Sequence, residues 1–235
     1  MNKLTRILPA IAAVALLLAP SLARAASDEA VRVRAATETL TEVMSIPEQG
    51  IPETLLRNSY GVAVFPGAIK AGLGIGGSYG HGVLVVRDAK GAWTNPIFLT
   101  LAGGSIGWQA GVQSNDLILV FKTRRGIDDL MNGEFTLGAQ ASVAAGPVGR
   151  YAEAGTNAQL RSEIFSYSRS RGLFAGVSLE GAALSIDNRA NAAYYGNPDV
   201  TPRSIIARRG INAPPGASGF SCMVARYSGT SQVCG

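Results

Sequence analysis

The stretch VAVFPGAIKAGLGIGGSYGHGVLVV, residues 62–86, determines how the rest of the chain is interpreted. Val62 to Phe65 and Val83 to Val86 are apolar runs of strand length, and Pro66-Gly67 ends the first run. Continuous apolar runs bounded by turn residues are typical of strands buried on both faces. Between them, from Ala71 to Gly82, glycine alternates with apolar residues. We therefore expect two strands, and glycine between them permits bulges and sharp bends, or close approach of another backbone or ligand.

The same pattern continues downstream. Ile97 to Leu101 and Leu117 to Phe121 predict a third and a fourth strand, with a second Gly-rich segment from Ala102 to Gly111 between them. Further strands are expected over residues 135–145, 164–167 and 173–186. Short strands separated by turn residues favour an antiparallel sheet or a partial barrel.

Helical patterns flank these runs. Asp28 and Glu29 follow Ser27 in the manner of a capped first turn, and apolar residues then recur at helical spacing up to Met44, before Pro47. A second short helix is expected at Pro52, and others over residues 126–132, 187–195 and 201–210. The predicted fold class is therefore α+β: mainly an antiparallel, Gly-rich sheet or partial barrel with N-terminal and peripheral helices.

The first 25 residues have the layout of a secretory signal. Lys3 and Arg6 precede an apolar run over residues 7–19, and Ala23-Arg24-Ala25 matches a signal-peptidase site. The run is shorter than the roughly 20 apolar residues that span a bilayer, so a cleaved signal is favoured over an anchor. We expect export to the periplasm or cell envelope of a bacterium, with residues 26–59 forming N-terminal helices, 60–196 a β-rich core, and 197–235 a helix, a linker and a cysteine-bearing tail.

Removal of this segment takes Lys3, Arg6 and Arg24 and no acid, so the formal charge falls from +5 to +2. Nucleic-acid binding requires a dense, one-sided basic surface, and a charge of +2 gives no such expectation. The two cysteines, Cys222 and Cys234, are expected to form a disulfide in an oxidising compartment. They do not make a metal site, because no histidine or carboxylate lies near them in sequence.

Three short motifs suggest catalysis or cofactor binding, and each lacks its required context. Residues 72–77 match a dinucleotide fingerprint, but a strand follows where a helix must begin. Residues 76–80 and 103–107 match the serine-hydrolase elbow. The chain has one histidine, His81, which is close to Ser78 but has no evident orienting acid. We expect no enzyme activity, no catalytic residue, no metal and no cofactor.

A family resemblance covers most of the chain from Gly61 to Gly196. The chain resembles the SYLF-domain family, the lipid-binding module also found in yeast and animal actin-regulatory proteins. The segments that carry the resemblance are Lys70-Ala71-Gly72, Gly76 to Gly80, Gly82-Val83-Leu84, Gly104 to Gly107, Ala144 to Arg150, Tyr167 to Ser170, Gly172 to Gly176, Asn191 and Tyr194 to Gly196.

The resemblance implies binding to phospholipid membranes. For an exported bacterial protein we expect an anionic phospholipid as the partner and do not expect actin. Headgroup contacts are predicted at Arg150, Arg169 and Arg171, and apolar contacts at Tyr167 and Phe174, although either aromatic ring could belong to the core. The alternative is a structural or protein-interaction module of the envelope that has an envelope protein as its partner and no lipid ligand.

Overall fold

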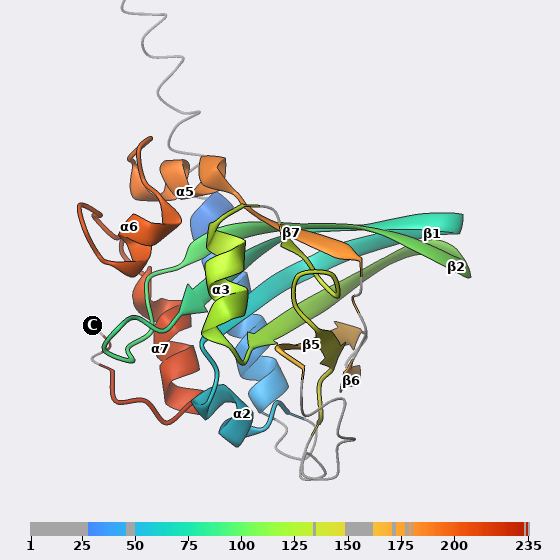
Figure 1. Ribbon diagram of the computed structural model, residues 1–235, viewed down its shortest axis with the longest axis horizontal. Coiled ribbons are helices and arrows are strands. Elements are labelled where there is room, and N and C mark those ends of the chain that lie inside the picture. The colour runs from blue at the N-terminus through green and yellow to red at the C-terminus, as the bar shows by residue number, and fades with distance from the viewer. Residues whose placement is uncertain are drawn as a thin grey trace, which may run out of the picture.

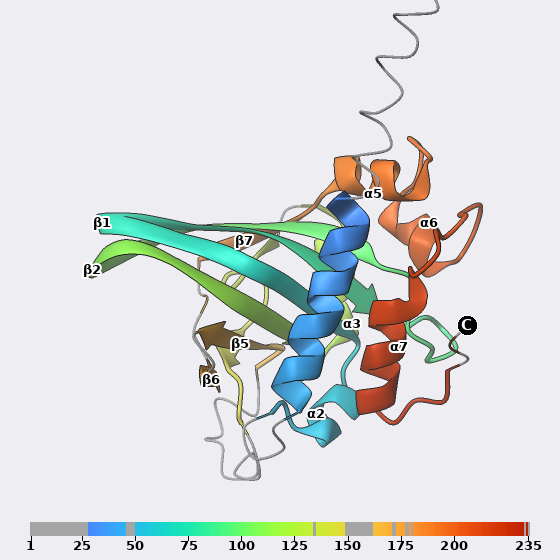
Figure 2. The ribbon, with the colours of Figure 1, turned by 180° about the vertical axis from the view of Figure 1, so that it is seen from behind.

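The computed structural model describes residues 28–45, 50–133, 135–148, 162–170, 173–176, 179, 181–232 and 234. Its centre is one curled sheet with helices on both sides (Figures 1 and 2). Most strand pairs are antiparallel, and β4 with β5 is the parallel pair among those described. The predicted α+β class is therefore confirmed.

Two very long strands form most of the sheet. β1 (Gly61–Val86) and β2 (Ile97–Phe121) pair from Gly61↔Phe121 to Leu84↔Ile97. The prediction of four separate strands in this region is wrong, because the Gly-rich segments continue the ladder of backbone hydrogen bonds. Such a ladder requires no side chain, so glycine can extend it. The register shifts between Phe65 and Ala68 and again between Gly72 and Gly74.

The ribbon formed by β1 and β2 folds back on itself, so that the two halves of β1 lie face to face. A Cβ added to Gly82 would lie 2.4 Å from the ring of Phe65, and one added to Gly80 would lie 2.9 Å from the Cβ of Ala68. The two ends of β1 lie side by side, because the N–H of Arg87, just after the strand, donates to the carbonyl of Tyr60, just before it, at 2.9 Å. The middle of the ribbon projects away from the body of the protein (Figure 1).

The remaining strands line the other edge of β2. They are β3 (Phe135–Thr136), β4 (Val143–Ala145), β5 (Ile164–Ser170), β6 (Leu173–Gly176) and β7 (Ala182–Ile186). β5 pairs with the second half of β2, and β7 pairs with the first half. The single strands predicted over 135–145 and 173–186 each divide in two; the first is interrupted by a turn in which Gly138 has φ 86°.

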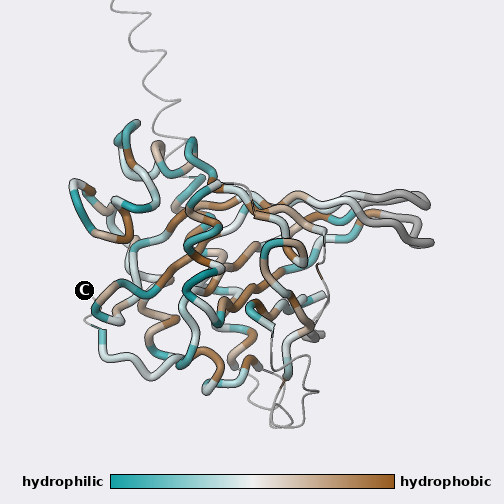
Figure 3. The backbone as a smooth tube through the Cα atoms, viewed as in Figure 1, coloured by the Kyte–Doolittle hydropathy of each residue, from teal (hydrophilic) through white to brown (hydrophobic). Residues whose placement is uncertain are grey.

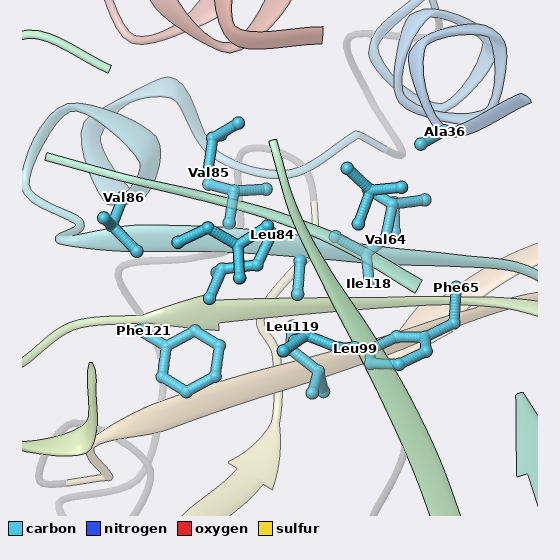
Figure 4. Packing of buried hydrophobic residues seen from close by; sticks show 14 of the residues in the cluster. Ala36, Val64, Phe65, Leu84, Val85, Val86, Leu99, Ile118, Leu119 and Phe121 are labelled. Carbon is cyan, nitrogen blue, oxygen red and sulfur yellow. The ribbon is translucent and has the colours of Figure 1, made fainter. Parts of the chain in front are cut away.

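Helices cover the sheet on opposite sides. The helix of residues 28–44 and α7 (Ser218–Tyr227) lie on one side, and α3 (Arg124–Met131) lies on the other (Figures 1 and 2). Figure 4 shows Val64 on the same side as Ala36 of the N-terminal helix, whereas Leu119 and Phe121 point the opposite way. Successive side chains of the strands are thus buried on both faces, which explains apolar runs without alternation. Figure 3 shows these apolar segments concentrated in the strands within the body.

The described residues after Gly196 contribute side chains to the same core, among them Val200 and Ile205. α2 (Glu53–Arg57), α5 (Asn188–Tyr195) and α6 (Pro202–Ile206) complete the described helices for which both ends are defined. α7, a helix that the sequence analysis missed, contributes the fully buried Phe220 and Val224. The predicted disulfide joins Cys222 and Cys234, with a Cα–Cα distance of 5.8 Å.

Arg87 connects this C-terminal region to the start of the sheet. Its guanidinium lies over the Trp93 ring at 4.4 Å and donates to the Ser59 carbonyl at 2.8 Å and the Thr230 hydroxyl at 3.0 Å. Trp93 Nε1 in turn donates to the Ser228 hydroxyl at 3.0 Å. Burial lowers the pKa of Arg87. These contacts hold the chain after α7 against the loop that joins β1 to β2.

The contact between Gly82 and Phe65 gives a direct test of the folded ribbon. Gly82→Ala places a methyl group inside the Phe65 ring, so we expect the free energy of unfolding to fall by about 2–3 kcal/mol. Urea denaturation measures the change. Gly104→Ala is the matched control, because an added Cβ at this strand glycine has no atom within 4 Å. Equal stability of the two variants would contradict the face-to-face packing.

Candidate functional site

The structure describes the side chains of two of the five predicted lipid-contact residues. Arg150 and Arg171 lie outside the described residues. Phe174 lies in β6, and its side chain is also outside the described part of the chain. The surroundings of Tyr167 and Arg169, both on β5, are defined. The structure therefore shows the environments of these two residues and does not bring all five together.

Tyr167 is part of the core. Its ring is fully buried and lies directly against Gly146, where an added Cβ would be only 2.0 Å from Cζ. Its hydroxyl donates to the Pro147 carbonyl at 3.1 Å, and burial raises the pKa of this phenol. Of the two roles considered for this ring, core packing is the one that the structure displays.

Arg169 is held in ion pairs within the protein. It pairs with Glu42 of the helix of residues 28–44, and its Nη1 lies 3.6 Å from Oδ2 of Asp116 on β2. Asp116 also accepts the Gly67 N–H at 2.9 Å. Arg169 thus ties the N-terminal helix to both long strands, and it can contact a phosphate only by leaving these carboxylates.

Three further arginines on or after α3 and α6 also make contacts within the protein. Arg203 donates to the side chain of Asn132 at 2.7 Å, Arg208 donates to the Trp93 carbonyl at 2.9 Å, and Arg125 lies 3.6 Å from Asp129. They lie on or after α3 and α6, in separate structural contacts.

The projecting ribbon carries an exposed apolar surface that the sequence analysis missed. Ile69 is 49% exposed, Tyr79 48% and Val112 75%. Ala68 and Gly80 face each other inside the folded ribbon, so their neighbours Ile69 and Tyr79 point outward, each from its own layer. Val112 pairs with residue 71 and therefore shares the face of Ile69. We call these three exposed residues, which lie on the two outer faces of the projection, the ribbon surface; the exposed Lys70 follows Ile69 in β1 and faces the other side of the strand.

A sequence signal for this surface exists. Residues 71–86 and 97–115 contain no Asp, Glu, Lys or Arg. Strands buried in the body explain the two ends of these segments, but the projecting middle has no such cover. An exposed, uncharged segment with large apolar side chains is typical of a surface that meets a membrane or a partner.

A polar cluster lies on the outer face of β1 near the base of the ribbon. Tyr79 Oη lies 3.0 Å from Nε2 of His81, and His81 Nδ1 lies 3.5 Å from Oδ2 of Asp187. Asp187 also caps α5 by accepting the Ala190 N–H at 3.0 Å. Asp187 is thus a carboxylate close to His81, which the sequence analysis did not identify. Ser78 points to the opposite face of the strand, so the predicted possibility of a Ser78–His81 contact is not realised.

The N-terminal helix contacts the same cluster. Arg32 Nη1 lies 3.0 Å from Glu29 and 3.8 Å from Asp187, and its guanidinium lies over the Phe98 ring at 5.5 Å. Burial raises the pKa of Glu29, with a smaller opposing effect from Arg32. Together with Arg169, this cluster docks both ends of the helix of residues 28–44 onto the sheet.

A metal site would require His, Cys, Asp or Glu side chains gathered at one point. Within the described ranges, no group of three or more has that arrangement. Likewise, none of the helices in those ranges is long and apolar enough to cross a membrane.

The fold defines an α+β domain in which a folded β-ribbon carries an exposed apolar surface. Comparison with known proteins is consistent with this class: the family described as "Ysc84: Las17-binding protein actin regulator" matches residues 102–227, which is more than half of the chain. The chain belongs to this Ysc84, or SYLF, family, so the predicted resemblance is confirmed. The match includes α7, beyond the region from Gly61 to Gly196 that carries the sequence motifs.

Relatives in fungi and animals cover similar lengths of the chain. Protein YSC84 of Saccharomyces cerevisiae is 37% identical over 173 residues, which are 72% of this chain and 36% of that protein. LAS seventeen-binding protein 3 of the same species is 37% identical over 171 residues, 72% of this chain and 37% of that protein. The human SH3 domain-containing YSC84-like protein 1 is 34% identical over 150 residues, 63% of this chain and 44% of that protein. The chain thus matches less than half of each of these relatives.

Arg169 provides a test of how the N-terminal helix is anchored. We expect Arg169→Gln to lower the free energy of unfolding by about 1 kcal/mol, because Glu42 and Asp116 lose a partly exposed ion pair. Urea denaturation measures this loss. The matched control is Arg124→Gln on α3, an exposed position without an ion pair in the described part of the chain. The two variants should differ clearly, and equal effects would rule out an anchoring role for Arg169.

Proposed function

We propose that the chain is an exported, non-enzymatic protein that associates peripherally with anionic phospholipid through the ribbon surface. The observation that carries this proposal is the exposure of Ile69, Tyr79 and Val112 on the projecting ribbon, where Tyr79 and Val112 lie in segments without ionic charges. Their apolar side chains lose contact with water when they enter the interfacial layer of a bilayer, at about 25 cal/mol per Å² of buried area.

The backbone of the ribbon suits this environment. β1 and β2 pair along nearly their whole length, so the N–H and C=O groups that face the partner strand are satisfied. Unpaired backbone groups are costly in a lipid environment, and this pairing avoids part of that cost. Tyr79 adds an amphipathic ring of the kind that favours the interface.

Basic side chains supply the preference for anionic lipid in this proposal. Lys70 follows Ile69 on the projecting strand and is exposed on its other face, and the predicted headgroup contacts Arg150 and Arg171 remain predictions. Each cationic side chain near an anionic membrane contributes about 1 kcal/mol. Arg169 would contribute only if lipid phosphate replaced its carboxylate partners.

Vesicle binding tests the ribbon surface. The protein is co-sedimented with vesicles of phosphatidylcholine alone or mixed with equal phosphatidylglycerol, at low and high salt. We expect Ile69→Ser/Val112→Ser to weaken binding by about tenfold, because two apolar side chains no longer enter the interface. Val31→Ser is the matched control, since Val31 is 57% exposed on the N-terminal helix, away from the ribbon.

Binding that ignores both lipid charge and ionic strength would argue against the basic side chains. Equal loss in Val31→Ser and in the ribbon double variant would argue against the ribbon surface. If the folded protein bound no vesicle of any composition, the alternative of a protein-interaction module would be favoured. The family description and the name of the yeast LAS seventeen-binding protein 3 refer to binding of another protein, which makes this alternative concrete.

The proposed export rests on the signal-like segment of residues 1–25 and gains support from the Cys222–Cys234 disulfide, since such bonds persist in oxidising compartments. Mass spectrometry of the protein recovered from a bacterial envelope fraction should show a chain that begins at Ala26. Both cysteines should resist alkylation until a reductant is added. A recovered chain that retains residues 1–25, with freely alkylated thiols, would contradict export.

A further inference from the structure

A second surface lies apart from the ribbon surface, between the helix of residues 28–44 and the start of α7. It is a groove of about 220 Å³, lined by Ala30, Val33, Arg34, Thr37, Tyr194 and Gly219, among others. We call it the helix groove. Its position on the N-terminal helix, α5 and α7 brings together three elements that are distant in sequence.

The walls of the helix groove are mainly apolar. Ala30, Val33 and Thr37 are spaced three or four residues apart and so lie on one face of the helix. The Thr37 hydroxyl donates to the Val33 carbonyl at 2.8 Å, which satisfies its polar group within the helix. At the opposite wall, a Cβ added to Gly219 would meet no atom within 4 Å. The groove therefore has room for an apolar chain beside Gly219.

Tyr194 gives the groove an unused hydrogen-bond donor. It is only 6% exposed, and its hydroxyl has no hydrogen-bond partner among the described residues. Its ring packs on Phe98 and Tyr195 at centroid distances of 4.9 and 5.1 Å. By contrast, the Tyr195 hydroxyl donates to the Pro96 carbonyl at 2.6 Å. Because this hydroxyl has no protein acceptor among those residues, an acceptor oxygen brought by a ligand could take its hydrogen bond.

Arg34 places a cation at the same groove. It is exposed, and no carboxylate within the described ranges pairs with it, whereas Arg32 on the same helix is paired with Glu29. Burial raises the pKa of Tyr194 to about 12, so its hydroxyl keeps the proton that it would donate. An apolar channel with a donor and a cation matches an amphiphile that has an acidic head.

We propose that the helix groove binds one acyl chain of an anionic amphiphile, with Arg34 contacting a carboxylate or phosphate head and Tyr194 donating to an oxygen of the ligand. A volume of 220 Å³ corresponds to roughly seven water-sized groups at about 30 Å³ each. That volume accommodates part of one acyl chain. The proposal rests on the proposed function in taking lipid as the ligand class, but it concerns a different surface.

Calorimetric titration of the whole mature protein with decanoate and with decyl phosphate, both below their micelle concentrations, tests this site. We expect saturable binding of one molecule per chain, and binding of decyltrimethylammonium at least tenfold weaker. The two anions distinguish a fatty-acid carboxylate from a phospholipid phosphate as the preferred head. Absence of saturable binding by both anions, or equal binding of the cation, would overturn the proposal.

Three variants locate the site. Gly219→Leu fills the groove and should abolish binding, while the free energy of unfolding should not fall, because leucine is a better helix former than glycine. Tyr194→Phe keeps the ring and should weaken binding about tenfold, the size expected for a lost hydrogen bond to a charged group. Arg34→Gln should remove the preference for anions. The matched controls are Arg226→Leu at the other end of α7 and Arg189→Gln on α5, both exposed.

Unchanged decanoate binding in Gly219→Leu and Tyr194→Phe would overturn the assignment to this groove. Failure of this proposal is separable from failure of the ribbon surface. Gly219→Leu should keep wild-type vesicle binding, whereas Ile69→Ser/Val112→Ser should keep wild-type decanoate binding. If Gly219→Leu lost both vesicle binding and decanoate binding, the proposal that the helix groove and the ribbon surface bind independently would be overturned.

Discussion

The close approach of Phe65 to Gly82 is the constraint on which the rest of the structure depends. It allows one half of β1 to lie on the other half, which turns a two-stranded ribbon into two layers. β5 then adds to one layer and β7 to the other, so a single folded hairpin organises the whole sheet. A side chain at position 82 would separate the layers, and the core between them would lose the dense packing on which protein interiors depend.

Folding the ribbon also determines what is exposed. Near its ends, both faces of the strands are covered, one by the opposite layer and the other by helices. The middle extends past these helices, and there Ile69, Tyr79 and Val112 are exposed. Burial in the body and exposure on the projection thus have a common origin in two strands that are longer than the body they cross.

Local sequence patterns were sufficient for the elements whose ends depend on near neighbours. Pro52, Thr201 and Asp187 lie at helix starts as predicted, because caps and prolines act within a few residues. The four strands were not recognised as two, since their continuity rests on pairings across tens of residues. The environments of Tyr167 and Arg169 were not predicted for the same reason. The hydrogen-bond acceptor of Tyr167 lies 20 residues away in sequence, and the ion-pair partners of Arg169, Asp116 and Glu42, lie still farther away. The signal for the ribbon surface was an absence of charge, which acquires meaning only when that segment is known to project.

The helix of residues 28–44 connects the two candidate lipid-binding surfaces. One face supplies Ala30, Val33 and Thr37 to the helix groove, while Arg32 reaches the cluster of Asp187 and His81 that also contacts Tyr79 of the ribbon. Glu42 and Arg169 anchor the other end of the helix to the long strands. Because both ends are tied to the sheet, the groove and the ribbon are held in one rigid arrangement, and a membrane contacted by the ribbon would lie at a fixed position relative to the groove. Capture of a single chain and attachment to a bilayer can therefore be separate properties of one domain, each encoded by its own side chains.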